Sequence, residues 1–150
     1  MDLEAVVDLA RGGRLRLETA FRHLPDSDSE THTHGGFEII HHLTSEVAVA
    51  IDHGRELRFG VGSTRICRPG VVHSQRVIVP GENWCILVAC DSTAAGAVNL
   101  PPCVRIDGPL PASLLSEAAD LTLPRDDGDD VERAVLDLRS AALLLALLGF

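Results

Sequence analysis

The chain contains no lysine and no tyrosine, and its 150 residues include only one tryptophan and four phenylalanines. With so few aromatic side chains, the core must be filled by leucine, valine, isoleucine and alanine. All thirteen basic residues are arginines, and the formal net charge is −9. Because this charge repels a phosphate backbone, we predict that these residues do not contact DNA by themselves.

No segment has the pattern of a signal peptide or of a membrane span. Residues 1–4 lack the basic and apolar stretches of a signal peptide, and the longest apolar run, residues 141–149, is about half of what a bilayer requires. We therefore predict a cytoplasmic protein without membrane contact. The four cysteines show no C-x-x-C spacing, and we predict that they are reduced, buried thiols: Cys67, Cys85, Cys90 and Cys103.

A length of 150 residues indicates one domain with one core. From residue 14 the apolar period is two, which predicts a strand with Leu15, Leu17, Thr19 and Phe21 on one face. Further strand patterns recur about every ten residues between glycines and prolines, over 37–43, 47–51, 56–59, 64–67, 74–79 and 84–90. Residues 52–55 predict a tight hairpin with a positive φ at Gly54 and an exposed His53. The pattern is typical of an all-β sandwich or small barrel.

Three potential metal ligands lie close together in the sequence. His32 and His34 are two residues apart in an extended segment and so share a face, and Glu38 can join them if Gly35 and Gly36 bend the chain. A fourth, His73, follows a Pro-Gly turn and can return on a neighbouring strand. Three imidazoles and one carboxylate suit one divalent ion such as zinc, iron, nickel or manganese, and leave coordination positions open.

Two further side chains have the right parity to reach the same interior. His42 has the parity of Glu38, so it is a candidate ligand-binding residue, whereas His41 is expected to face outward. Gln75 has the parity of His73 and can hydrogen-bond a small molecule inside a barrel. The six candidate ligand-binding residues are therefore His32, His34, Glu38, His42, His73 and Gln75. We assign no catalytic residue.

The order His-x-His-x-x-x-Glu, followed by Gly62, Arg68 and Pro69-Gly70-x-x-His73, resembles the two signature motifs of the cupin superfamily over about residues 14 to 91. The resemblance implies a mainly β fold, a double-stranded β-helix or small jelly-roll barrel, with helices after it. It also implies that the four ligand positions point into the barrel. Ser45 and Val77 depart from the motifs, at positions where the family has glycine and often asparagine.

After residue 91 the character of the sequence changes. Pro101, Pro102, Pro109 and Pro111 are expected to end the sheet, so we predict a connection over 92–110. A helix beginning at Pro111 would place Leu114, Leu115, Ala118 and Leu121 on one stripe. Residues 131–148 predict a last helix with two leucine-rich stripes, one for the barrel and one for a dimer partner or for protein that follows. The predicted segments are a helix within 1–13, a barrel over 14–91, the connection and a helical dimerisation segment over 111–150.

A cupin barrel followed by leucine-rich helices resembles the N-terminal sensing domains of AraC-type transcription regulators. That resemblance implies a small-molecule effector in the barrel, a homodimer through the C-terminal helix, and DNA contact only through a further domain. The intact ligand pattern leaves a second function open, namely a metal-dependent enzyme such as a dioxygenase, isomerase or decarboxylase. A barrel that serves only for dimerisation is a third.

Overall fold

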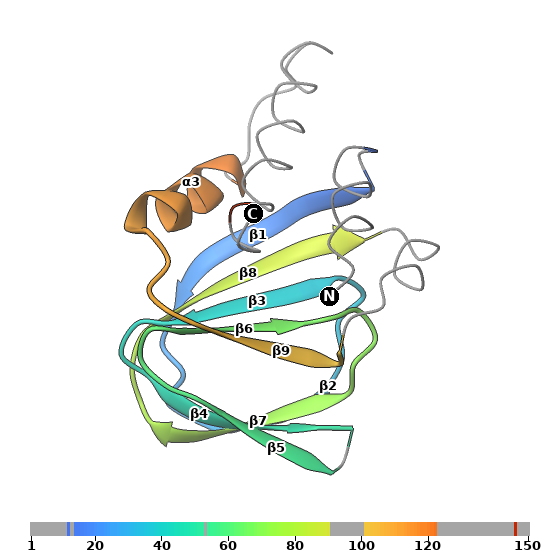
Figure 1. The fold of residues 1–150 in the computed structure, drawn as a ribbon, viewed down its shortest axis with the longest axis vertical. Coiled ribbons are helices and arrows are strands. Elements are labelled where there is room, and N and C mark those ends of the chain that lie inside the picture. The colour runs from blue at the N-terminus through green and yellow to red at the C-terminus, as the bar shows by residue number, and fades with distance from the viewer. Residues whose placement is uncertain (1–11, 13, 53, 91–100, 123–145, 147–150) are drawn as a thin grey trace.

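The computed structural model describes residues 12, 14–52, 54–90, 101–122 and 146, and these form two antiparallel sheets and a helix (Figure 1). The five-stranded sheet has the order β1-β8-β3-β6-β9 and the four-stranded sheet the order β2-β7-β4-β5. The elements are β1 (Leu15–His23), β2 (Ser29–His32), β3 (Phe37–His42), β4 (Glu46–Ile51), β5 (Arg55–Phe59), β6 (Ser63–Cys67), β7 (His73–Val79), β8 (Asn83–Cys90), β9 (Cys103–Asp107) and α3 (Ala112–Thr122). The predicted mainly β fold with a helix after it is confirmed.

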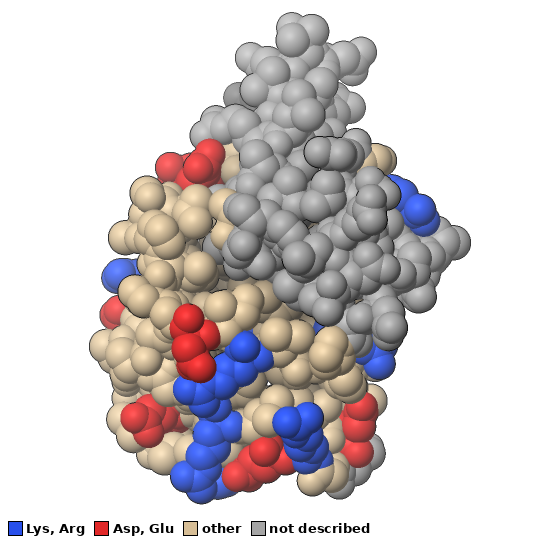
Figure 2. Space-filling model, viewed as in Figure 1, with Lys and Arg blue, Asp and Glu red and all other residues tan. Residues whose placement is uncertain are grey.

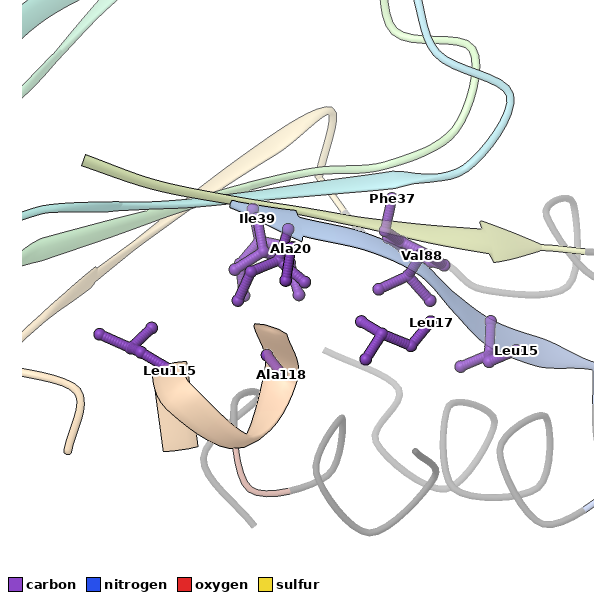
Figure 3. Packing of buried hydrophobic residues seen from close by; sticks show 10 residues of the cluster. Leu15, Leu17, Ala20, Phe37, Ile39, Val88, Leu115 and Ala118 are labelled. Carbon is purple, nitrogen blue, oxygen red and sulfur yellow. The ribbon is translucent and has the colours of Figure 1, made fainter. Parts of the chain in front are cut away.

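Helix α3 packs on the outer face of the five-stranded sheet. Leu115 and Ala118 are 2% and 0% exposed and contact the apolar side chains that β1, β3 and β8 present on that face (Figure 3). Leu114 and Leu121 are partly buried against the same cluster. The predicted stripe is therefore confirmed, and the helix begins directly after Pro111, whose fixed φ suits that position.

A second apolar cluster lies among the inward side chains of the two sheets. Val47, Val49 and Phe59 from β4 and β5 are buried there beside Cys67 and Cys103 from β6 and β9. The two clusters follow from the alternation of side chains along a strand, because successive residues point to opposite faces of a sheet. The inner cluster occupies one part of the barrel, and polar side chains occupy another.

Two features differ from the sequence-based expectation. The register of β1 shifts between Leu17 and Thr19, so that Ala20 is buried while Phe21 is 44% exposed. A bulge of this kind inverts the alternation, and the prediction that Phe21 shares the face of Leu15 and Leu17 was wrong. The structure also places strand β9 inside the segment predicted as a connection, where it pairs with β6. The flanking prolines lie outside Cys103–Asp107 and do not interrupt its hydrogen bonds.

The hairpin between β4 and β5 has the predicted position but another backbone geometry. Asp52 takes the positive φ, 47°, in place of Gly54; aspartate tolerates this region better than most residues. His53 and nearly all of the predicted helices within 1–13 and over 131–148, with the leucine stripes of the latter, lie outside the described residues. In the part of the chain that the structure describes, no helix is both long and apolar enough to cross a membrane.

Candidate metal centre

Four side chains converge at one end of the barrel. His32 ends β2, His34 lies in the loop that follows, Glu38 is the second residue of β3, and His73 begins β7. The ligand atoms that these residues offer all lie within 4.8 Å of one another. The predicted cluster of His32, His34, Glu38 and His73 is thus brought together by two sheets, and His32 and His73 are direct partners in the pairing of β2 with β7.

The loop that carries His34 is held by backbone contacts. The amide of Gly70 donates to the carbonyl of His34 at 2.9 Å, which joins the turn before β7 to the loop before β3. Gly36 lies directly against the backbone of Val88, where a Cβ would collide with the carbonyl oxygen. Glycine is therefore required at Gly36 for close approach to β8.

Two of the three imidazoles are oriented by carbonyl groups. Nδ1 of His32 lies 2.7 Å from the carbonyl oxygen of Glu30, and Nδ1 of His73 lies 3.1 Å from that of Val71. Because a carbonyl oxygen only accepts hydrogen bonds, Nδ1 carries the proton in both rings, and Nε2 keeps its lone pair. This is the usual outer contact of a histidine that ligates a metal through Nε2.

The Glu38 carboxylate is buried and contacts three partners. Its Oε1 lies 3.3 Å from Nε2 of His34, and its Oε2 lies 3.3 Å from Nε2 of His73 and 2.7 Å from a terminal guanidinium nitrogen of Arg65. Burial by itself would raise the pKa of Glu38, but the charge of Arg65, together with the adjacent imidazoles of His34 and His73, outweighs it and holds the pKa well below its usual range. The carboxylate is therefore ionised at neutral pH.

Arg65 is the site residue that the sequence analysis did not identify. Its side chain is 2% exposed, and besides Glu38 it donates to Oε1 of Gln75 at 3.2 Å. Arg65 is the one charged residue in the strand Ser63–Cys67, and it has the parity of the inward Cys67. A lone arginine at an inward position of an otherwise uncharged strand is the signal that could have found it.

The two remaining candidates occupy different places. Gln75, which is 8% exposed, adjoins the cluster through Arg65. His42 is fully buried but is not one of the four converging groups, since its Nδ1 pairs with Oγ of Ser45 at 2.9 Å and its ring stacks on Phe59. Burial, followed by the charge of Arg65, lowers the pKa of His42 to about 3. Ser45, one of the two departures from the cupin motifs, thus has a defined contact.

His41 differs in part from its expectation. It does lie on the opposite face from Glu38 and His42, but it is 3% exposed rather than open to solvent. Its Nδ1 pairs with Oγ1 of Thr64 at 2.9 Å on the neighbouring strand. Neither His41 nor Thr64 belongs to the cluster of His32, His34, Glu38 and His73.

The donor set fits a divalent cation. Nε2 of His34 and Nε2 of His73 are buried and have no geometrically acceptable hydrogen-bond partner among the described residues. Buried polar atoms are normally paired, so two unpaired imidazole nitrogens beside an ionised carboxylate are the arrangement that a borderline metal ion would satisfy.

No protein-family model and no curated protein sequence matches the chain. Several solved structures do. YhaK from Escherichia coli aligns with a TM-score of 0.52 at 13% identity, over 62% of this chain and 43% of YhaK, so the chain spans less than half of that protein. An RmlC-like cupin from Shewanella frigidimarina aligns with a TM-score of 0.44 at 18% identity, over 55% of this chain and 82% of that one. Apo ToxT from Vibrio cholerae aligns with a TM-score of 0.44 at 7% identity, over 85% of this chain and 55% of ToxT. At these identities the likeness concerns the fold alone, and the two antiparallel sheets confirm the predicted mainly β, jelly-roll-like architecture.

Proposed function

We propose that this chain is the small-molecule-sensing domain of an AraC-type regulator, and that its barrel holds one divalent cation on His32, His34, Glu38 and His73. The observation that carries the proposal is the convergence of four ligand atoms within 4.8 Å. In two of the rings a backbone carbonyl engages Nδ1, which leaves Nε2 available to bind an ion. Such preorganisation lowers the cost of binding an ion.

A bound zinc, iron, nickel or manganese ion would act as a Lewis acid with coordination positions left for an oxygen atom of a small molecule. The protein part of the site carries almost no net charge, because Glu38 and Arg65 neutralise each other at 2.7 Å. A divalent ion would therefore make the site positive. This balance favours an anionic effector, such as a small carboxylate, over a neutral one.

The surroundings of Glu38 favour binding over acid–base catalysis. Among the described residues it is the one buried carboxylate, and both of its oxygens are engaged by Arg65, His34 and His73. A general base must accept a proton from the substrate, and a carboxylate held in this way is a poor acceptor. The interior therefore offers groups that recognise and orient a ligand rather than groups that exchange protons with it.

The regulatory part of the proposal rests on the sequence. The two leucine-rich stripes over residues 131–148 would allow one face to pair with a second copy of the chain. An effector can change that pairing only if it binds two helical arrangements with different affinity. DNA would be contacted by a separate domain, because the formal net charge of −9 repels a phosphate backbone. Figure 2 shows arginine side chains with acidic side chains beside them over the lower half of the molecule.

The metal part is tested by elemental analysis and calorimetric titration of the purified protein. We expect about one divalent ion per chain, and for His34→Ala an affinity at least ~10-fold weaker. His23→Ala is the matched control, since His23 lies on β1 outside the cluster. Protein that binds no divalent ion at micromolar concentration, or a His34→Ala variant that binds as the parent does, would contradict the assignment.

The sensing part is tested on the same metal-loaded protein. Small carboxylates and neutral molecules of matched size are compared by thermal shift and by sedimentation, and the mixtures are then searched for products by mass spectrometry. We expect a carboxylate to stabilise the protein and change its self-association, with no product formed. Catalytic turnover of a bound molecule would instead favour the metal-enzyme function.

A further inference from the structure

Two thiols face each other inside the barrel, and neither belongs to the metal-ligand cluster. Cys67 on β6 and Cys103 on β9 are direct partners in the strand pairing, and their sulfur atoms lie 3.0 Å apart. Both residues are buried, with 1% and 8% of their surface exposed. Directly opposed side chains point to the same face of the sheet, so the two sulfurs can approach without any change of register.

Among the described residues, one cavity is lined by Cys103 and not by Cys67. Cys103 lines a cavity of about 270 Å³ between the β4–β5 hairpin and the Pro101-Pro102 segment. The apolar walls of this cavity include Ile51 and Leu57, and Cys67 is not part of its lining. A small reagent that enters this cavity therefore meets Cys103 first and finds Cys67 behind it.

We propose that Cys103 and Cys67 form a peroxide-responsive thiol pair, in which Cys103 is oxidised first and Cys67 then closes a disulfide. The Cys103 thiolate attacks one oxygen of hydrogen peroxide, the O–O bond breaks, and Cys103 becomes a sulfenic acid, while the leaving hydroxide takes up the proton that the thiol released and departs as water. The Cys67 sulfur attacks the Cys103 sulfur, an S–S bond forms, and the second water leaves. Two thiols are oxidised and one peroxide is reduced.

The hydrogen bonding of the pair agrees with this order. The Cys67 thiol donates to the sulfur of Cys103, which lowers the pKa of Cys103. Cys85 provides the contrast, because burial raises its pKa to about 12. The thiolate is the reactive form of cysteine, so Cys85 should be inert where Cys103 reacts.

The disulfide would join β9 to the sheet beside the metal cluster. Cys67 pairs with Cys103 on β9 and with Glu38 on β3. One row across the sheet therefore contains the candidate metal ligand Glu38, then Cys67, then Cys103. A bond of about 2.05 Å requires the sulfurs to move closer by about 1 Å. The closed loop would also raise the urea midpoint of unfolding, because a cross-link restricts the unfolded chain.

The test uses the reduced full chain and equimolar hydrogen peroxide, followed by alkylation and peptide mass mapping. We expect the loss of two alkylatable thiols, the loss of two hydrogen masses, and one linked peptide that joins Cys67 to Cys103. Dithiothreitol should reverse all three. Cys85→Ser, the matched control, should form the same link at the same rate.

The order of events is tested with two further variants. Cys67→Ser should stop at a sulfenic acid on Cys103 that dimedone traps, and Cys103→Ser should leave Cys67 unmodified. A link through Cys85 or Cys90, or native thiols that stay unmodified while the urea-unfolded chain is oxidised, would overturn the proposal. Peptide mapping of the oxidised parent protein tests the Cys67–Cys103 link even if a variant fails to fold. Because this mapping detects only the state of the thiols, its result does not depend on whether the protein binds a metal.

Discussion

Replacing Arg65 by methionine should destabilise the metal-free protein strongly, and a divalent cation should restore much of the loss. Methionine keeps the apolar length of the side chain but removes the guanidinium that lies 2.7 Å from Oε2 of Glu38. The two side chains are 2% and 6% exposed, so water cannot replace the lost partner. The Glu38 carboxylate would remain buried beside the imidazoles of His34 and His73, without its guanidinium partner.

The size of the effect follows from the geometry. At 2.7 Å the attraction between two unit charges is about 6 kcal/mol if the effective dielectric constant is about 20. The cost of desolvating both groups cancels part of this attraction, but removing one partner alone typically costs about 3–5 kcal/mol. We therefore expect Arg65→Met to lower the free energy of unfolding by about 3–5 kcal/mol, and the double variant Arg65→Met, Glu38→Gln to recover a large part of that loss.

Urea unfolding, followed by circular dichroism with chelator and with saturating zinc or manganese, measures these quantities. Because the ion binds the folded state, it should stabilise Arg65→Met by more than it stabilises the parent, as the cation is then the sole positive partner of Glu38. A loss below about 1 kcal/mol, or equal metal stabilisation in parent and variant, would refute the assigned role of the Arg65–Glu38 pair.

Two other predictions concern the histidine interior and the ligand loop. The pKa of His42 is about 3 in the folded protein against an ordinary value of 6.5, so its neutral form stabilises the fold above pH 6.5 and this contribution is lost as the pH falls from 6.5 towards 3. Between pH 6.5 and 5 the free energy of unfolding should fall by about 2 kcal/mol through this residue. His42→Gln should show a correspondingly smaller fall when urea unfolding is measured at several pH values. If the free energy of unfolding of variant and parent falls equally with pH, this account is contradicted. Gly36→Ala should destabilise the protein by about 1–3 kcal/mol and weaken metal binding, because the new methyl group would meet the Val88 carbonyl oxygen. Gly35→Ala, which has open space within 4 Å, should leave both properties nearly unchanged, and equal behaviour of the two variants in calorimetry would disprove the steric argument.

The placement of the four candidate ligands could be predicted because it depends on short stretches of chain. Parity along a strand decides which of Glu38, His41 and His42 point inward, and the Pro69-Gly70 turn returns His73 to the same end of the barrel. Such information is local, since the period of two is a property of any extended segment. For the same reason α3 was predictable from its apolar stripe, which needs only the helical period.

Features that depend on the pairing of distant strands could not be predicted. The bulge in β1 is defined by its register against β8, and it turns Phe21 outward although the sequence alternates regularly through it. Strand β9 exists because the edge of β6 is available for pairing, and that edge is not visible in the segment itself. Local propensity is a weak guide where a neighbouring strand decides the outcome.

Arg65 combines both kinds of information, and it is the residue on which the chemistry of the site most depends. In the pairing of β3 with β6, Glu38 lies opposite Cys67 and Ile40 lies opposite Arg65, so Glu38 and Arg65 are diagonal neighbours on the inner face. A diagonal separation of about 7–8 Å between Cα atoms is within reach of a long arginine side chain. A register shift of one residue would turn Arg65 to the outer face and leave Glu38 without its cation. The motif therefore defines which atoms could hold a metal, whereas the register between β3 and β6, which brings together two residues 27 positions apart, defines the charge that the metal would meet.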